Sequence, residues 1–258
     1  MHITFRLRGE NDFLRVPSAN LHLFQSLLYR ILPPERAAFL HEEGYRVDGR
    51  SMKLFAMSWP IASGRPVFEE KAICFPLPVS LVVSTPVEPT LDGLASGALA
   101  AEKLRVGNNV LYCDHIEVRQ LHASGESLVV RTLSPITCYD QVGRYGKPYT
   151  IYFGPYQKDF PVSVSNNLRR KFQALYPGRP LPESPVHIEP IGRPLERIAR
   201  FSPDVSFPIK GWWGRFRLEG PEELLQIALD CGLGAKNSAG WGCVEKEEGG
   251  RSVIPYEM

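Results

Sequence analysis

The sequence predicts an α+β protein made of two tandem ferredoxin-like domains, each with the element order β-α-β-β-α-β. Two observations support this prediction. The chain has 258 residues, which is enough for two domains of ordinary size. Short runs of alternating apolar and polar residues, typical of half-buried strands, are interleaved with segments whose apolar residues recur every three or four positions, as on one face of a helix. We place the domains at residues 1–127 and 128–258.

The first half contains the six expected elements and one additional helical turn. Alternation predicts a strand over residues 3–8, and an apolar stripe predicts a helix over 18–32. Pro33 and Pro34 end that helix, and Pro34 is well placed as the first residue of a short second helix. The remaining expected elements are strands at 53–59 and 73–84, a helix at 91–104 and a strand at 110–118.

The second half follows the same order less closely, because two strands precede its first helix. No sequence repeat relates the two halves, so the prediction of a second ferredoxin-like domain depends on the order of its elements alone. The expected elements are strands at 128–138 and 149–153, a helix at 162–176, strands at 186–190 and 205–218, a helix from Pro221 to Asp230 and a final strand from Trp241.

The composition indicates a globular protein and argues against several other classes. The 43% of hydrophobic and 22% of charged residues are typical of a soluble domain. The five cysteines form no CxxC pair, so neither a disulfide framework nor a zinc site is predicted. The chain enters a strand pattern at once, and no uncharged apolar run approaches the length of a membrane span. We therefore expect a cytoplasmic protein without membrane association, metal or cofactor.

The net charge of +2 is too small to indicate a nucleic-acid-binding protein by itself. The charges are unevenly distributed, however. Over residues 144–217 basic side chains outnumber acidic ones more than two to one. This excess predicts a basic face on the second domain, which is the electrostatic feature that attracts a phosphate backbone.

The most distinctive motif is the glycine-rich segment GLGAKNSAGWGCV at residues 232–244. Glycine lets a backbone approach a ligand closely and adopt positive φ, and successive backbone N–H groups can bind an anion. The glycine spacing fits neither a Walker loop nor a dinucleotide fingerprint. A tight turn before an edge strand is the structural alternative. We predict contacts to a phosphate backbone from Gly232, Gly234, Lys236, Asn237, Ser238, Gly240 and Gly242.

This segment resembles the signature loop of the RAMP superfamily of CRISPR-associated RNA-binding proteins, and especially that of the Cas6 family, the endoribonucleases that cut the precursor CRISPR transcript. The resemblance implies two ferredoxin-like domains with the loop in the second. It extends to the first half, where Tyr29 on the first helix, His41 after the second helical turn and Lys53 at the start of the next strand resemble the catalytic residues of that family.

These three residue types suit RNA cleavage without a metal, in which the 2′-hydroxyl of the substrate attacks the adjacent phosphate. Histidine can donate or accept a proton near neutral pH. Lysine supplies positive charge where negative charge develops, and tyrosine can orient by hydrogen bonding. The structural alternatives are that His41 caps a helix end, that Tyr29 anchors its helix and that Lys53 is an exposed strand charge.

Two further basic groups are candidate RNA contacts. Arg169, Arg170 and Lys171 fall within a predicted helix. The alternative is that they form the solvent-exposed face of that helix and contact no RNA. Lys210, Arg215 and Arg217 flank Trp212 and Trp213 on a strand-like run, and aromatic side chains can stack on unpaired bases. The alternative for the tryptophan pair is that one ring lies in the core and the other outside.

The resemblance implies a metal-independent endoribonuclease that cleaves the CRISPR repeat on the 3′ side of a stem, leaving a 5′-hydroxyl and a 2′,3′-cyclic phosphate. Its expected partners are precursor crRNA and other CRISPR-associated proteins of an effector complex, and a homodimer is one candidate assembly. The alternative is a catalytically silent RNA-binding RAMP subunit, which would lack a histidine at the position of His41. A small-molecule phosphate-binding enzyme would need a carboxylate or metal cluster, which the sequence does not indicate.

Overall fold

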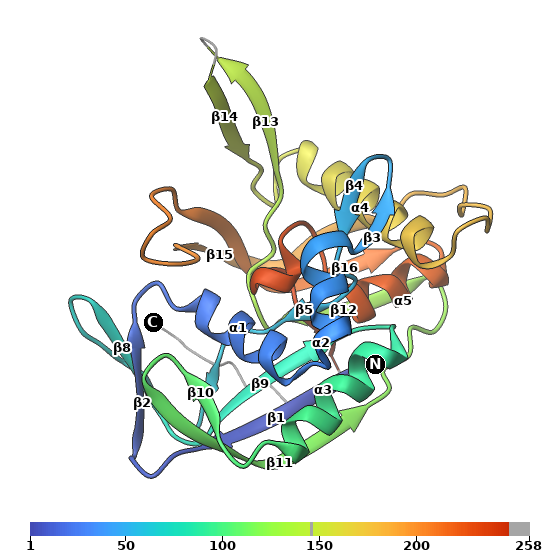
Figure 1. Ribbon diagram of the computed structural model, residues 1–258. Helices are drawn as coiled ribbons and strands as arrows, with labels where there is room; N and C mark the ends of the chain where they lie inside the picture. Colours follow the sequence, from blue (N-terminus) through green and yellow to red (C-terminus); the bar gives the residue numbers. More distant parts are fainter. Residues whose placement is uncertain (145–146, 248–258) are drawn as a thin grey trace.

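The first domain is built on an antiparallel sheet with the strand order β11-β1-β9-β5 (Figure 1). The computed structural model describes residues 1–144 and 147–247. One helix follows β1 and a second follows β9, which gives the predicted order β-α-β-β-α-β. The elements of this unit are β1 (His2–Arg8), α1 (Leu21–Ile31), β5 (Ala56–Met57), β9 (Val79–Ser84), α3 (Glu88–Ala100) and β11 (Asn109–Arg119).

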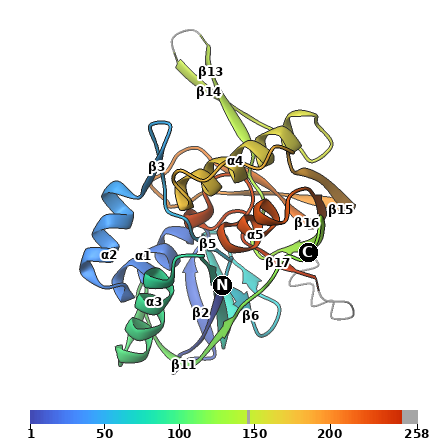
Figure 2. The same ribbon diagram turned by 90° about the vertical axis from the view of Figure 1, so that its right-hand side faces the viewer.

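The second domain repeats this architecture in a sheet with the order β15-β16-β12-β17. Helices α4 and α5 pack against each other on one side of it (Figure 2). The second unit therefore has the same element order and the same relative strand positions as the first, which confirms the predicted fold class. Its elements are β12 (Ser127–Thr132), α4 (Asp159–Leu175), β15 (His187–Ala199), β16 (Ile209–Glu219), α5 (Glu222–Cys231) and β17 (Val244–Lys246).

A hairpin inserted between β12 and α4 explains why two strands precede the first helix of this domain. Strands β13 (Tyr139–Arg144) and β14 (Lys147–Tyr152) pair only with each other among the described strands, and they project from the body of the molecule (Figures 1 and 2). The strand expected over 128–138 was too long. It ends at Thr132, and the buried segment that follows connects the sheet to the base of the hairpin.

Three expectations for the first domain were wrong in detail. The strand expected over 73–84 is two strands, β8 (Ala72–Pro76) and β9, because the Leu77–Pro78 segment interrupts it and β8 joins a separate sheet. The strand expected over 53–59 is reduced to β5, since Leu54 has a positive φ of 52°. The helix expected over 91–104 ends at Ala100.

Several short strands complete the first domain. Two of them extend the main sheet, two join β8 in the separate sheet β2-β8-β7, and two form a hairpin after the second helix. They are β2 (Phe13–Pro17), β3 (Tyr45–Val47), β4 (Arg50–Met52), β6 (Ile61–Ala62), β7 (Val67–Phe68) and β10 (Leu104–Val106).

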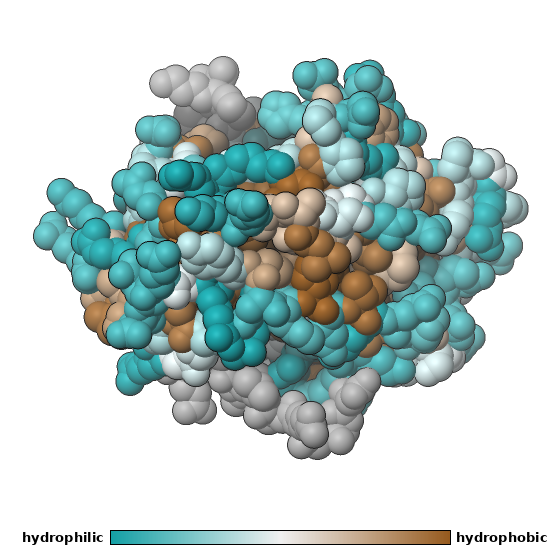
Figure 3. All heavy atoms as spheres, turned by 60° about the horizontal axis from the view of Figure 1, so that its bottom comes forward, coloured by the Kyte–Doolittle hydropathy of each residue, from teal (hydrophilic) through white to brown (hydrophobic). Residues whose placement is uncertain are grey.

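The two domains meet through buried contacts that include the glycine-rich segment. Leu21 of α1, Ile209 of β16 and Trp241 form one small apolar cluster at this junction. The indole N–H of Trp59 donates a hydrogen bond to the carbonyl of Gly240 at 2.7 Å. Figure 3 shows one face of the molecule, on which hydrophilic side chains surround an apolar patch near the centre. No helix in the described parts of the chain is long and apolar enough to cross a membrane.

Candidate functional site

Helix α1 carries the first of the candidate catalytic residues. Its apolar face is buried in the core of the first domain, through Phe24, Leu28 and others. Gln25 and Tyr29 are half-buried and lie four residues apart, so their side chains project from adjacent turns of one helical face. The phenol ring of Tyr29 also packs edge-on against Phe55. This packing fixes the ring beside the domain core while leaving part of it at the surface.

His41 is placed by a change in helical geometry. The short helix α2 (Pro34–Ala38) continues into a π-helical turn, Phe39–Glu43, in which Leu40 is fully buried and His41 is exposed. Such turns are rare and often occur at functional sites. Gly44 ends the turn with a φ of 64°, where a side chain would be strained and would collide with Ser51 and Met52.

The structure brings Tyr29, His41 and Lys53 together in one cluster. The rings of Tyr29 and His41 have centroids 6.0 Å apart and are nearly perpendicular, at 87°. The Lys53 Nζ donates a hydrogen bond to the backbone carbonyl of His41 at 2.9 Å. Lys53 directly follows β4, so the hairpin β3-β4 returns the chain to the turn that bears the histidine. Three residues from separate elements thus share one surface.

Burial changes the acid–base properties of two of these groups in opposite directions. Removal from water raises the pKa of the Tyr29 phenol, so this group stays protonated and remains a hydrogen-bond donor at neutral pH. Desolvation lowers the pKa of the Lys53 ammonium, because burial disfavours the charged form. The exposed imidazole of His41 contacts the ring of Tyr29, and the Lys53 ammonium is bound to the backbone of the same histidine.

The glycines of segment 232–244, which we call the glycine loop, face the interior. Gly232, Gly234, Gly240 and Gly242 are all buried and all have positive φ. A Cβ on Gly234 would overlap the carbonyl of Thr137, and one on Gly242 would overlap the carbonyl of Leu233. Their conformation and internal packing therefore require glycine, and their burial argues against direct contact of these four residues with a ligand.

The tip of the glycine loop is the part that reaches the surface. Lys236 is exposed with a φ of 59°, and its ammonium lies 5.4 Å from the ring centroid of Tyr139 at the base of the projecting hairpin. Asn237 is buried, and its side-chain amide donates to the carbonyls of Leu233 and Trp241, both at 2.9 Å. Asn237 thus closes the loop internally, whereas Lys236 is available to an external anion.

A direct hydrogen bond joins the glycine loop to the helix of the candidate catalytic cluster. The Gln25 Nε2 donates to the carbonyl of Ser238 at 2.8 Å. Because Tyr29 lies one turn further along the same face, the tip of the loop and the Tyr29–His41–Lys53 cluster are held on one rigid element. Of the sequence-predicted residues, this surface contains the three catalytic candidates, Lys236 and Ser238.

The other predicted RNA contacts are placed elsewhere, and most of them are engaged within the protein. Arg170 is half-buried, and Lys171 is buried. Each remaining cation has an internal partner: Arg169 donates to the carbonyl of Pro182 at 2.6 Å, Lys210 pairs with Glu196 at 3.2 Å, Arg215 with Glu247 at 2.7 Å and Arg217 with Glu189 at 3.0 Å. Trp212 is buried in the core while Trp213 is only partly buried, as the structural alternative for this pair anticipated.

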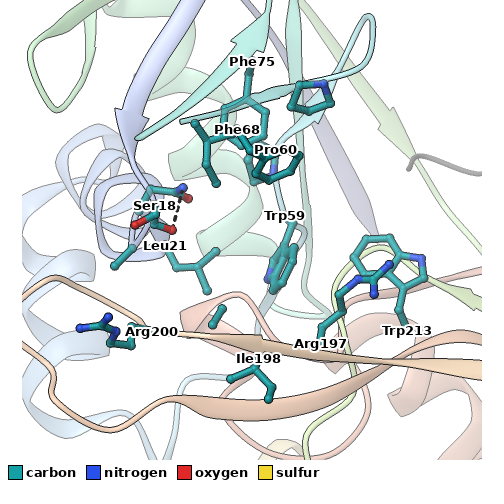
Figure 4. Close-up of a pocket in the computed structure, with 15 residues that line it drawn as sticks. Ser18, Leu21, Trp59, Pro60, Phe68, Phe75, Arg197, Ile198, Arg200 and Trp213 are labelled. Atoms are coloured by element: carbon teal, nitrogen blue, oxygen red, sulfur yellow. Dashed lines mark hydrogen bonds between the residues drawn. The ribbon is translucent and has the colours of Figure 1, made fainter. Parts of the chain in front are cut away.

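A pocket of about 330 Å³ lies beside the other end of α1 and was not anticipated from the sequence. Figure 4 shows Trp59 standing between the start of α1, near Ser18, and the strand that carries Arg197. Aromatic and basic side chains line the pocket, as in sites that stack unpaired bases. No sequence signal could have found it, because its walls come from distant segments. Its aromatic and basic residues are Trp59, Phe68, Phe75, Arg197, Arg200 and Trp213.

Trp59 connects this pocket to the glycine loop. Its ring lies 5.8 Å from that of Trp241 and 5.8 Å from that of Trp213, in addition to its hydrogen bond to Gly240. The pocket, the loop and the cluster therefore form a continuous series along α1, which spans about 12 Å between Leu21 and Tyr29 at 1.5 Å per residue. Within the described residues, no group of three His, Cys, Asp or Glu side chains is arranged to hold a metal ion.

Comparison with known proteins links the chain to a single family. Residues 118–246 match the family described as CRISPR associated protein Cas6, C-terminal. The chain is 28% identical over 249 residues to the CRISPR-associated endoribonuclease Cas6 of Pyrococcus furiosus, covering 94% of this chain and 88% of the relative. It is 23% identical over 251 residues to CRISPR-associated endoribonuclease Cas6 1 of Methanocaldococcus jannaschii, covering 96% and 93% of the two chains.

Solved structures with lower sequence identity have the same fold. A Cas6-related protein of Pyrococcus furiosus superposes with a TM-score of 0.83 at 19% identity, covering 97% of this chain and 99% of the other. A structure described as a RAMP protein binding different RNA substrates has a TM-score of 0.81 at 20% identity, covering 96% and 100%. At these identities the comparison shows that the fold is the same and gives no information on individual side chains.

Proposed function

The chain belongs to the Cas6 family, and on that premise we propose that it is an endoribonuclease that cuts CRISPR precursor RNA within the repeat. The two curated relatives that align along nearly the whole chain are both endoribonucleases of this kind. The observation that carries the proposal for this chain is the juxtaposition of Tyr29, His41 and Lys53 on one accessible surface.

We assign the chemistry to this cluster as a metal-independent reaction. The 2′-oxygen of the RNA forms a bond to phosphorus as the bond to the leaving 5′-oxygen breaks, giving a 2′,3′-cyclic phosphate and a 5′-hydroxyl. The exposed imidazole of His41 is the group suited to transfer a proton in this step. The Lys53 ammonium supplies positive charge to the phosphorane, and the protonated Tyr29 phenol donates a hydrogen bond.

We place the rest of the repeat RNA along α1. The tip of the glycine loop, through Lys236, is suited to one phosphate, and the aromatic pocket beside Trp59 is suited to unpaired bases. Precursor crRNA is therefore the proposed partner, bound in the cytoplasm. Other CRISPR-associated proteins of an effector complex and a second copy of the chain remain proposed partners.

The competing function is that of a catalytically silent RNA-binding subunit. Such a protein would need the pocket and the loop but no proton-transfer group beside them. An exposed histidine on a π-helical turn, with a phenol ring beside its imidazole and an ammonium bound to its backbone carbonyl, favours the enzyme.

The test is a cleavage assay with the repeat RNA of the host in excess EDTA. We expect cleavage to persist, because the three side chains supply acid–base and electrostatic catalysis themselves. A single 2′-deoxy substitution at the scissile nucleotide should abolish cleavage while leaving binding intact, because it removes only the nucleophile. Loss of activity in EDTA that magnesium restores would contradict metal independence, and binding without any cleavage would favour the silent subunit.

A further inference from the structure

Lys171 was predicted to contact RNA, yet its side chain is turned into the protein. The residue is 4% exposed and lies on the inner face of α4, among the core residues of the second domain. Its ammonium donates to three backbone carbonyls, those of Cys231 at 3.1 Å, Gly232 at 2.7 Å and Gly234 at 3.4 Å. All three acceptors lie at the point where α5 ends and the glycine loop begins.

Three acceptors match the three N–H donors of an ammonium. The carbonyl of Cys231 belongs to the last residue of α5, where the negative end of the helix dipole favours a cation. The carbonyls of Gly232 and Gly234 belong to residues with positive φ, 73° and 66°, whose orientation no regular secondary structure maintains. A single buried cation thus satisfies carbonyls that would otherwise be buried without partners.

We propose that Lys171 is a positioning residue that holds the glycine loop in the shape in which its tip binds RNA. The inference rests on the proposed function, because it assigns RNA binding to the loop. Only a short segment separates the carbonyls that Lys171 binds from the surface of the molecule. Gly234 is two residues from Lys236 at the tip, and Ser238 then receives the hydrogen bond of Gln25 from the helix that carries Tyr29.

The surroundings of Lys171 allow it to titrate within an accessible pH range. The facing thiols of Cys138 and Cys231 are buried, which raises the pKa of each to about 12 and keeps them neutral. The nearby carboxylate of Asp230 is engaged by the N-terminal ammonium and by the Gln226 amide. Burial lowers the pKa of the Lys171 ammonium to about 8. A neutral amine would have only two donors for three carbonyls.

RNA binding and this protonation are therefore linked. Phosphates at the loop tip favour the charged form of Lys171, so RNA binding raises its pKa. By reciprocity, RNA affinity is full below pH 8 and declines as the pH rises through that value. A residue with a merely structural role would give no such decline in affinity.

The experiment measures the dissociation constant for a non-cleavable 2′-deoxy repeat RNA from about pH 6.5 to 9.5, together with single-turnover cleavage at saturating RNA. The variants are Lys171→Met, which removes all three donors, and Lys171→Gln, which keeps two donors without titrating. Val164→Ala is the matched control, because Val164 is fully buried on the same helix, about two turns before Lys171, and its apolar side chain cannot donate to the loop carbonyls. Lys236→Ala is included to test the loop tip itself.

We expect Lys171→Met to bind RNA about tenfold more weakly at pH 7, because the three buried carbonyls lose their partner and the loop no longer keeps its shape. Lys171→Gln should bind with intermediate affinity and lose the decline near pH 8, and saturated cleavage should change little in either variant. Val164→Ala should lower the melting temperature and leave affinity unchanged.

Wild-type affinity in Lys171→Met with a lowered melting temperature, as in Val164→Ala, would overturn the proposal. If Lys171→Met does not fold, an unaltered decline near pH 8 in Lys171→Gln would overturn it instead. If Lys236→Ala weakens binding at the same time, RNA does use the loop, and these results refute only the positioning role of Lys171. If Lys236→Ala and Lys171→Met both bind normally, the RNA does not use the loop, and absence of cleavage by the wild-type protein would refute the proposed function itself.

Discussion

The two parts of the site that helix α1 joins are built in opposite ways. The glycine loop is interior: its four glycines are buried, and its carbonyls and its Asn237 side chain are bound within the protein. The Tyr29–His41–Lys53 cluster is at the surface, where only Tyr29 has aromatic packing on the core side. The loop therefore provides shape, and the cluster provides reactive groups.

This difference separates the consequences of substitution. A change at one of the buried glycines disturbs backbone geometry, so it should act first on folding and on RNA binding. A change in the cluster alters an accessible side chain and should act on the rate of the chemical step. Substitutions in each part test that separation, beginning with the largest expected effect.

Replacing His41 by alanine should slow single-turnover cleavage by about 10²–10⁴-fold, the usual contribution of a positioned acid or base. RNA affinity and melting temperature should be nearly unchanged, because the side chain is exposed. Single-turnover kinetics at saturating RNA measure the rate, and a filter-binding assay measures affinity. The control is His115→Ala, an exposed histidine on β11, which should cleave normally.

A His41→Ala protein that cleaves at the wild-type rate would show that another residue transfers the proton. A variant that is slow because it no longer binds RNA would place His41 with the loop and remove the distinction between the two parts.

Replacing Gly242 by alanine should destabilise the protein by several kcal/mol. Positive φ costs a non-glycine residue about 1–2 kcal/mol, and the new methyl group would also overlap the carbonyl of Leu233. Gly49→Ala is the matched control, since Gly49 has a φ of 72° but no atom lies within 4 Å of where its Cβ would stand. Urea unfolding gives both free energies, and equal losses in the two variants would show that the loop is not tightly packed.

The fold was largely predictable because it depends on local patterns. The alternation in β1, the apolar stripe of α1 and Pro221 before α5 each encode an element. Of the inserted hairpin, only a strand at 149–153 was expected, and β13 was missed. Alternation shows that a segment is a strand but not which strand it pairs with. The same limit hid the break between β8 and β9.

The site was predictable only where the sequence resembles a known family. The grouping of Tyr29, His41 and Lys53 followed from family resemblance, and their catalytic role stays a prediction. The burial of Lys171 could not be foreseen, because it depends on which face of α4 meets the end of α5. The glycines indicated an unusual backbone, but their sequence does not say whether a ligand or the protein itself fills the space beside them.

The smallest effect should come from Lys236, where the interior loop becomes accessible. The Lys236 side chain is exposed. Its φ of 59° is equally unfavourable for lysine and for alanine, because both carry a Cβ. Lys236→Ala should therefore remove one phosphate contact without disturbing the buried glycines. The slope of log affinity against log salt should then fall by about 0.7, the value for one phosphate contact on a single strand. Lys103→Ala, an exposed lysine of the first domain, controls for the change in net charge. If both variants keep the wild-type slope, the loop tip makes no phosphate contact, and the loop is only the interior support of the junction between the two domains.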